Sequence, residues 1–261
     1  AGSAEGADGA DLLIGEIGQL DSVIGAGRRS LEQAISTDST DAWGGSDLIR
    51  GRAGAYIIVG GSSGDTIYAD DDPANLTEAD ADLDGADVIL GDFGVLDWDT
   101  GDGDLATLDL IESLGTGYAD RGGADTIEGN ADADTIIGGF AGDLIDGNGA
   151  ANARADADGA DVLLGDNGQI VLQGGAMALV QTQDETAIWA GVDTIRGASA
   201  SDIILGGLSG DVIDGDHLEG SRTLHDAADI VLGDNGVLDF GVDADLSTLD
   251  VIETTETGQG G

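Results

Sequence analysis

The residues of this chain that could do chemistry are aspartates, and they recur at a fixed spacing. Between residues 122 and 149, Asp125, Asp134 and Asp143 lie nine residues apart, and an isoleucine follows each of them two positions later. The same step recurs in two further triplets, Asp193, Asp202 and Asp211, and Asp47, Tyr56 and Asp65, where the tyrosine replaces the middle acid. Repeated carboxylates offer hard oxygen ligands, so the chemistry they predict is the binding of divalent cations.

A second acidic block punctuates these triplets. It reads GADLLIGEIGQL at 9–20, GADVILGDFGVL at 85–96, GADVLLGDNGQI at 159–170 and ADIVLGDNGVL at 228–238. Its acids come in pairs five residues apart, Asp87 with Asp92, Asp161 with Asp166, and Asp229 with Asp234, while Glu16 follows Asp11. Two interpretations stay open: the pairs form a second class of calcium site, or Asp-Asn-Gly is turn chemistry that favours positive φ.

The charge of the chain points to cations as partners. The net charge is −45, from 8 arginines, no lysine and 53 acidic residues among 261. Nucleic acids and anionic membranes carry the same sign, which argues against both. Such charge would ordinarily favour disorder. Here, however, Ile, Leu and Val recur in a fixed register with Asp and Gly, and this regularity argues against a disordered chain. No apolar run approaches the roughly 18 residues of a membrane span, so we expect no membrane insertion.

The elements that must position the aspartates are short strands. Each Asp-x-aliphatic segment predicts a strand of three to four residues, and each Gly, Asp or Asn cluster predicts a turn. Stacking of such units would align Ile127, Ile136 and Ile145 in one row and place successive aspartates about 4.8 Å apart. Helical spacing is weak, and its best candidates are residues 28–36 and 104–113.

Calcium is the cation that fits this pattern best. Carboxylates about 4.8 Å apart repel one another unless an ion lies between them. Calcium accepts six to eight oxygens in irregular geometry, including backbone carbonyls, whereas magnesium requires a near-ideal octahedron. The absence of cysteine and the presence of only two histidines argue against zinc and copper.

Three segments resemble a known nonapeptide. The sequences GGSSGDTIY at 60–68, GGFAGDLID at 138–146 and GGLSGDVID at 206–214 resemble the RTX, or hemolysin-type, repeat G-G-x-G-x-D-x-U-x, in which U is a large aliphatic residue. They keep its paired glycines, its sixth-position Asp and, at the eighth position, an aliphatic residue, but place Ala or Ser at the fourth. The resemblance implies a parallel β-roll, calcium bound by the sixth-position Asp and turn carbonyls, and a secreted bacterial protein. It therefore implies that Asp65, Asp143 and Asp211 are the strongest candidate ligands.

The sequence thus predicts an all-β fold, a parallel β-roll or β-solenoid built from nine-residue turns with irregular insertions packed against it. The predicted calcium ligands are Asp47, Asp65, Asp87, Asp92, Asp125, Asp134, Asp143, Asp161, Asp166, Asp193, Asp202, Asp211, Asp229 and Asp234. Tyr56 supplies no carboxylate, so we expect an ion to be missing there.

The whole chain, residues 1–261, is expected to be one continuous repeat array. Its approximate long repeats cover residues 11–86, 87–160, 161–228 and 229–261, and the pattern is cut at both ends, as in a segment of a larger array. Three consecutive aliphatic residues, as in Val88–Leu90, predict a strand covered on both faces, either by the irregular segments or by a neighbouring chain.

The function expected from these features is structural rather than enzymatic. His217 and His225 share one acidic loop with no cysteine or recurring serine, and the acids follow the repeat instead of forming one unique pair. We expect a calcium-stapled extracellular rod at the cell surface, as an adhesin stalk, filament or surface-layer component. Its partners would be calcium ions and further copies of the repeat, in the same chain or as head-to-tail or lateral neighbours. The alternative is a calcium-dependent adhesin module that binds carbohydrate or ice. Ice binding would need a regular row of threonines, and in this sequence that row is broken.

Overall fold

The described part of the protein is built entirely from strands. The computed structural model describes residues 11–16, 18–25, 28–36, 44–51, 54–69, 85–102, 104–115, 121–148, 159–183, 189–216, 227–243 and 245–255. Within these ranges there are 21 strands and no helix, and therefore no helix that could cross a membrane. The expected all-β class is confirmed.

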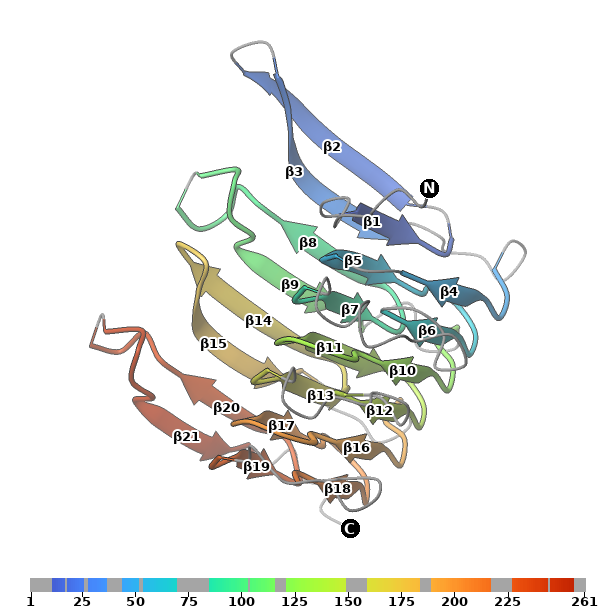
Figure 1. Ribbon diagram of the computed structural model, residues 1–261, viewed down its shortest axis with the longest axis vertical. Coiled ribbons are helices and arrows are strands. Elements are labelled where there is room, and N and C mark those ends of the chain that lie inside the picture. Colours follow the sequence, from blue (N-terminus) through green and yellow to red (C-terminus); the bar gives the residue numbers. More distant parts are fainter. Residues whose placement is uncertain are drawn as a thin grey trace, which may run out of the picture.

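The strands form three sheets that run side by side along the long axis (Figure 1). The central sheet has seven parallel strands: β1 (Asp11–Ile14), β5 (Tyr56–Val59), β7 (Val88–Leu90), β11 (Thr135–Gly139), β13 (Val162–Asp166), β17 (Ile203–Leu205) and β19 (Ile230–Leu232). The flanking sheet has six parallel strands: β4 (Leu48–Arg50), β6 (Thr66–Tyr68), β10 (Thr126–Glu128), β12 (Leu144–Asp146), β16 (Thr194–Arg196) and β18 (Val212–Asp214).

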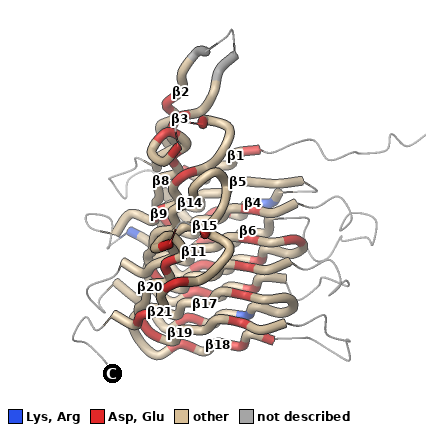
Figure 2. The backbone as a smooth tube through the Cα atoms, turned by 90° about the vertical axis from the view of Figure 1, so that its left-hand side faces the viewer, with Lys and Arg blue, Asp and Glu red and all other residues tan. Residues whose placement is uncertain are grey.

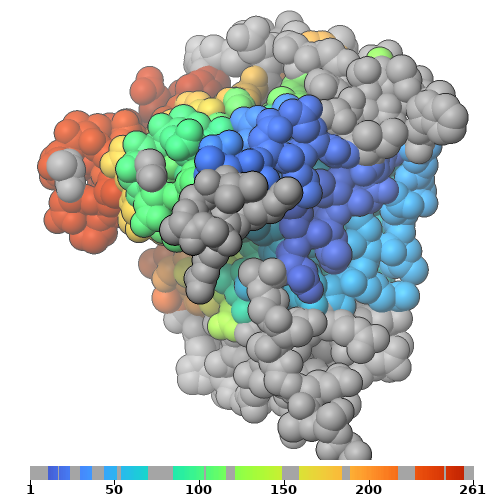
Figure 3. All heavy atoms as spheres, turned by 90° about the horizontal axis from the view of Figure 1, so that it is seen from above, coloured from blue at the N-terminus to red at the C-terminus, as the bar shows by residue number. Residues whose placement is uncertain are grey.

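The third sheet is antiparallel and has eight strands. They are β2 (Gly18–Gly25), β3 (Arg28–Ser36), β8 (Gly94–Asp97), β9 (Leu110–Ser113), β14 (Gly168–Gln173), β15 (Ala176–Thr182), β20 (Gly236–Asp239) and β21 (Val251–Thr254). Seen from above, the β1–β3 end of the molecule faces the viewer (Figure 3).

Chain order visits the sheets in a fixed sequence. One central strand is followed by an antiparallel pair, then by a flanking, a central and a flanking strand. This six-strand unit starts at β1, β7 and β13, and its first three strands recur at β19. Each flanking strand and the next central strand are too short to bury a face alone, so their stability depends on stacking.

Residues nine positions apart are not neighbours in a sheet, contrary to the expected row. Ile127 pairs with Ile145 in the flanking sheet, whereas Ile136 lies between Ile89 and Leu163 in the central sheet. The nine-residue step moves the chain from one parallel sheet to the other, so within a triplet adjacent rungs of one sheet are 18 residues apart.

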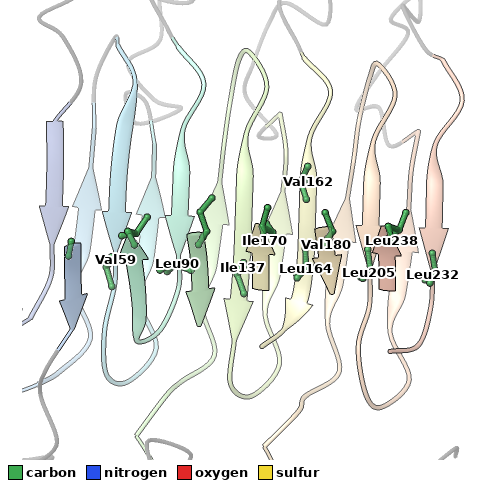
Figure 4. Packing of buried hydrophobic residues seen from close by; sticks show 13 residues of the cluster. Val59, Leu90, Ile137, Val162, Leu164, Ile170, Val180, Leu205, Leu232 and Leu238 are labelled. Carbon is green, nitrogen blue, oxygen red and sulfur yellow. The ribbon is translucent and has the colours of Figure 1, made fainter. Parts of the chain in front are cut away.

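Two apolar cores flank the central sheet. Its residues Ile58, Ile89 and Ile136 are fully buried against flanking-sheet residues such as Ile67 and Ile127. On its other face, a second cluster joins the central and antiparallel sheets (Figure 4). The buried members of that cluster include Val59, Leu90, Ile137, Leu164 and Leu205 from the central sheet and Leu96, Ile111, Ile170, Val180 and Leu238 from the antiparallel sheet.

The expected double covering of Val88–Leu90 is therefore confirmed, and the irregular segments provide the cover. The two helical candidates were wrong. Residues 28–36 form β3, and residues 110–113 of the second candidate form β9. Leu31 and Ala34 of β3 contribute to the second core, and this tertiary packing outweighs weak local helical preference.

Candidate metal centre

A row of aspartates runs along the flanking sheet, with one aspartate immediately before each strand. The backbone N–H of each donates to Oδ1 of the aspartate in the next rung, as from Asp65 to Asp125 at 2.6 Å and from Asp125 to Asp143 at 2.8 Å. The complete first row is Asp47, Asp65, Asp125, Asp143, Asp193 and Asp211, with the other hydrogen bonds at 2.7–3.0 Å. One oxygen of each carboxylate after Asp47 is thus fixed by a neighbouring amide.

The central sheet carries a second row with the same hydrogen bonds. Its members are Asp87, Asp134, Asp161, Asp202 and Asp229, and each N–H from Asp87 to Asp202 donates to Oδ1 of the next member at 2.8–3.0 Å. Tyr56 occupies the preceding position, and its N–H donates to Oδ1 of Asp87 at 2.6 Å. The tyrosine interrupts the second row of carboxylates, because Asp11 pairs with Tyr56 on one side and Asp87 lies on the other. Acidic residues recur rung after rung along the stacked strands in Figure 2.

Four first-row aspartates bury their second carboxylate oxygen without a hydrogen-bond donor. This holds for Oδ2 of Asp65, Asp125, Asp143 and Asp211. Asp65, Asp125 and Asp143 are only 2–3% exposed. A buried carboxylate oxygen with no donor is costly unless a cation or a proton compensates it.

Glycine carbonyls lie beside these oxygens. A Cβ on Gly206 would lie 2.6 Å from Oδ2 of Asp211 and 2.7 Å from the carbonyl oxygen of Gly233. A Cβ on Gly138 would collide in the same way with Oδ2 of Asp143 and the carbonyl oxygen of Gly165. The missing side chain therefore allows a carboxylate oxygen and a backbone carbonyl to approach the same point, and this is the donor type that calcium uses.

Four first-row carboxyl groups, those of Asp65, Asp125, Asp143 and Asp211, have raised pKa values and bind protons more tightly than ordinary aspartates. Burial raises the pKa of Asp65 to about 7 and that of Asp125 to about 8. Burial, together with the charge of Asp125, raises the pKa of Asp143 well above the usual range. Burial also raises the pKa of Asp211. A negative charge at these positions needs a compensating positive one.

The turns before Asp65, Asp143 and Asp211 have a left-handed residue at the altered fourth position of the nonapeptide. Ser63, Ala141 and Ser209 stand where the repeat has glycine, and their φ angles are 68°, 68° and 97°. This left-handed conformation is the one that glycine adopts most easily. At each of these three turns, a residue with a Cβ therefore occupies a left-handed backbone position.

The later acid of each pair in the second block has a different environment. Asp92 is 2% exposed, and its Oδ1 accepts from Gly123 N at 3.1 Å and its Oδ2 from Phe140 N at 2.6 Å. Asp166 is fully buried and accepts from Gly191 N at 3.3 Å and Leu208 N at 2.5 Å. Asp234 is exposed. Burial, and then the charge of Asp125, raises the pKa of Asp92 well above its usual range.

The predicted ligands are thus brought together in three sets: two rows, and a set of acids in the turns after central strands. The sequence placed Glu16 at the equivalent position of the second block, but the predicted ligands did not include it. Its Oε1 accepts from Gly45 N at 3.2 Å and from the Ser62 hydroxyl at 2.5 Å. Its position in the block, five residues after Asp11, was the available signal.

The described residues contain no cluster of three or more His, Cys, Asp or Glu side chains that could hold a metal ion by themselves. In a row, an ion between two rungs would face carboxylates from only those two rungs, and carbonyls would have to supply other oxygens. His217 and His225 lie outside the described residues.

The threonines considered for surface binding do not form an uninterrupted row. Thr66, Thr126 and Thr194 lie in one row of the flanking sheet, interrupted by Leu144, with Leu48 and Val212 at its ends. Thr135 lies in the central sheet, between Val88 and Val162.

No family model, curated protein or solved structure matches this chain.

Proposed function

We propose that this chain is a calcium-binding structural segment, related to RTX repeats, of a large secreted bacterial protein. One observation carries the proposal: Oδ2 of Asp65, Asp125, Asp143 and Asp211 is buried and has no hydrogen-bond donor. Beside Oδ2 of Asp143 and of Asp211 lies a glycine carbonyl oxygen. Calcium between rungs would supply the missing positive charge and accept both oxygen types.

The spacing of the rungs supports calcium over smaller ions. Neighbouring strands lie about 4.8 Å apart, so an ion midway between equivalent oxygens would be about 2.4 Å from each. That value lies within the 2.3–2.6 Å typical of calcium and beyond the roughly 2.1 Å of magnesium. The residues that would hold the ions are the two aspartate rows, with strand-ending glycines contributing carbonyls.

The rows would lie along a β-roll whose opposing walls are the central and flanking sheets. Apart from the antiparallel pairs, successive strands alternate between these two parallel sheets, and one apolar core fills the space between them. Stacked rungs joined by ions would form a stiff rod outside the cell, where millimolar calcium suits modules with dissociation constants of about 10⁻⁴–10⁻³ M. Such a rod fits an adhesin stalk, a filament or a surface layer, with no catalytic role.

Circular dichroism and small-angle X-ray scattering test the proposal. After divalent cations are removed, the chain should lose β-structure and expand at neutral pH, and calcium should restore both signals. Magnesium at the same concentration is the control and should restore much less. A chain that stays folded and compact without divalent cations at neutral pH, and binds no calcium in a calorimetric titration, would rule the proposal out.

A further inference from the structure

In the central sheet, an acid follows the glycine after the aliphatic run of a strand only where the chain leaves for the antiparallel sheet. Glu16, Asp92 and Asp166 follow Gly15, Gly91 and Gly165, and the antiparallel strands β2, β8 and β14 begin two residues after the acid. Asp234 has the same position, after Gly233 and two residues before β20. We call Glu16, Asp92 and Asp166, whose returning segments are described, the exit acids. In the intervening rungs the corresponding positions are Gly61, Gly139 and Gly207, whose φ angles are 115°, 114° and 106°.

Each exit acid precedes a segment that runs through the antiparallel sheet, and it accepts a hydrogen bond from the residue at which that segment returns. Asp92 accepts from the N–H of Gly123, and Gly123 lies two residues before Asp125, where the chain returns to the flanking sheet. Asp166 accepts from Gly191, two residues before Asp193, and Glu16 accepts from Gly45, two residues before Asp47. The segments between acid and donor differ in length, with sequence separations of 31, 25 and 29 residues. In all three, the same type of hydrogen bond, from a glycine N–H to the acid, joins their ends.

The other hydrogen bond of each exit acid reaches the next rung of the central sheet. Asp92 accepts from Phe140 N and Asp166 from Leu208 N, each two residues after a strand-ending glycine. Glu16 accepts from the hydroxyl of Ser62, which occupies the same position. An exit acid therefore joins three turns: its own, the returning turn, and the turn one rung further on.

The same three turns hold one candidate cation position. A Cβ on Gly91 would collide with Oδ2 of Asp125 and with the carbonyl oxygen of Gly138. Asp92 follows Gly91, binds the segment that leads into Asp125, and binds the turn that contains Gly138. Gly165 has the equivalent neighbours in Asp193 and Gly206, and Gly15 has them in Asp47 and Gly60.

We infer that the exit acids are positioning residues for alternate cation sites of the first row. This inference rests on the proposed function and adds to it two classes of site. Sites whose turns are joined by an exit acid are called clamped, and they lie at Asp47, Asp125 and Asp193. The unclamped sites, which have no exit acid, lie at Asp65, Asp143 and Asp211. Both oxygens of Asp92 and of Asp166 are occupied by backbone amides, so these acids act by fixing turns and by adding negative charge beside the ion. The clamped sites bind calcium more tightly because their ligands lose less freedom on binding.

Asp92→Asn tests this inference in the full chain by isothermal titration with calcium chloride. The amide is isosteric but removes the charge and one of the two acceptor oxygens. The wild type should show two classes of site, and the variant should lose one tight site or weaken it about 10–100-fold, as for outer-shell partners of metal ligands. Asp92→Glu should restore the isotherm, because Glu16 already fills the equivalent position. Asp99→Asn, an exposed acid in the β8–β9 connection, is the charge-matched control and should leave the isotherm unchanged.

The outcomes separate the two levels of the proposal. A single class of calcium site in the wild type, together with an unchanged isotherm for Asp92→Asn, overturns the positioning role and leaves calcium binding intact. Equal weakening by Asp92→Asn and Asp99→Asn also overturns it, because general charge loss would then suffice. A wild-type chain that binds no calcium overturns the proposed function itself. If Asp92→Asn does not fold, Glu16→Gln, at a half-buried position, should selectively weaken the site at Asp47.

Discussion

The backbone N–H of Asp125 donates a hydrogen bond of 2.8 Å to Oδ1 of Asp143, which lies 18 residues further along the chain. The same bond repeats from rung to rung, so each carboxylate is held in place by the backbone of its neighbour. This leaves Oδ2 of Asp125 and Asp143 buried and without a donor. The backbone thus arranges like charges in a row, and several measurements can show what compensates them.

Asp143→Asn should have opposite effects with and without calcium. Without divalent cations and at alkaline pH, where the carboxyl loses its proton, the substitution removes a buried charge close to Asp125 and Asp193, so the free energy of unfolding should rise. With calcium at about 100 times the dissociation constant, loss of one site should remove about 2.7 kcal/mol of stabilisation. Urea unfolding under both conditions measures the two effects. A variant less stable than the wild type without cations would contradict the assignment of uncompensated charge.

Without divalent cations, stability should fall as the pH rises from about 4 to about 8. The folded pKa values of Asp65 and Asp125, about 7 and about 8, exceed the unfolded value near 3.9. In this window the folded state binds more protons than the unfolded state, so deprotonation favours unfolding. Calcium affinity should rise over the same window, because protons and calcium compete. Urea midpoints at pH 4, 6 and 8 check the sign, and a midpoint that increases with pH in cation-free buffer would contradict it.

Gly206→Ala should destabilise the chain and weaken calcium binding. The new Cβ would lie 2.6 Å from Oδ2 of Asp211 and 2.7 Å from the Gly233 carbonyl oxygen, and overpacking of this kind costs about 1–3 kcal/mol. Gly210→Ala is the matched control, because a Cβ there meets nothing within 4 Å. Thermal unfolding and calcium titration should separate the two variants, and equal behaviour would argue against a close-packed ligand position at Gly206.

Ala141→Gly should stabilise the chain. Ala141 has a φ of 68°, and the left-handed conformation costs a residue with a Cβ about 1–2 kcal/mol. Glycine removes that cost. The greater conformational entropy of glycine in the unfolded state offsets about 0.5–1 kcal/mol of this gain. Ala124→Gly, at an exposed position with no recorded positive φ, should instead destabilise. Denaturation midpoints of the two variants test the difference in sign.

The sequence by itself predicted the all-β class, the short strands after each aspartate and the need to cover Val88–Leu90 on both faces. These features follow from local patterns, because alternation of side chains and glycine-rich turns acts over a few residues. The repeated spacing within a triplet predicted one row containing Asp125, Asp134 and Asp143. The structure keeps Asp125 and Asp143 in the same row, so that part of the grouping needed no tertiary information.

Only the tertiary structure decided which aspartates are neighbours. The nine-residue period does not say whether the next strand joins the same sheet or the opposite one, and the chain alternates, so Asp134 belongs to a different row from Asp125. The structure also decided that residues 28–36 form a strand, because pairing with β2 and β8 outweighs local preference. The contact between Asp92 and Gly123 depends on a return of the chain after 31 residues, and no local pattern specifies where such an excursion ends.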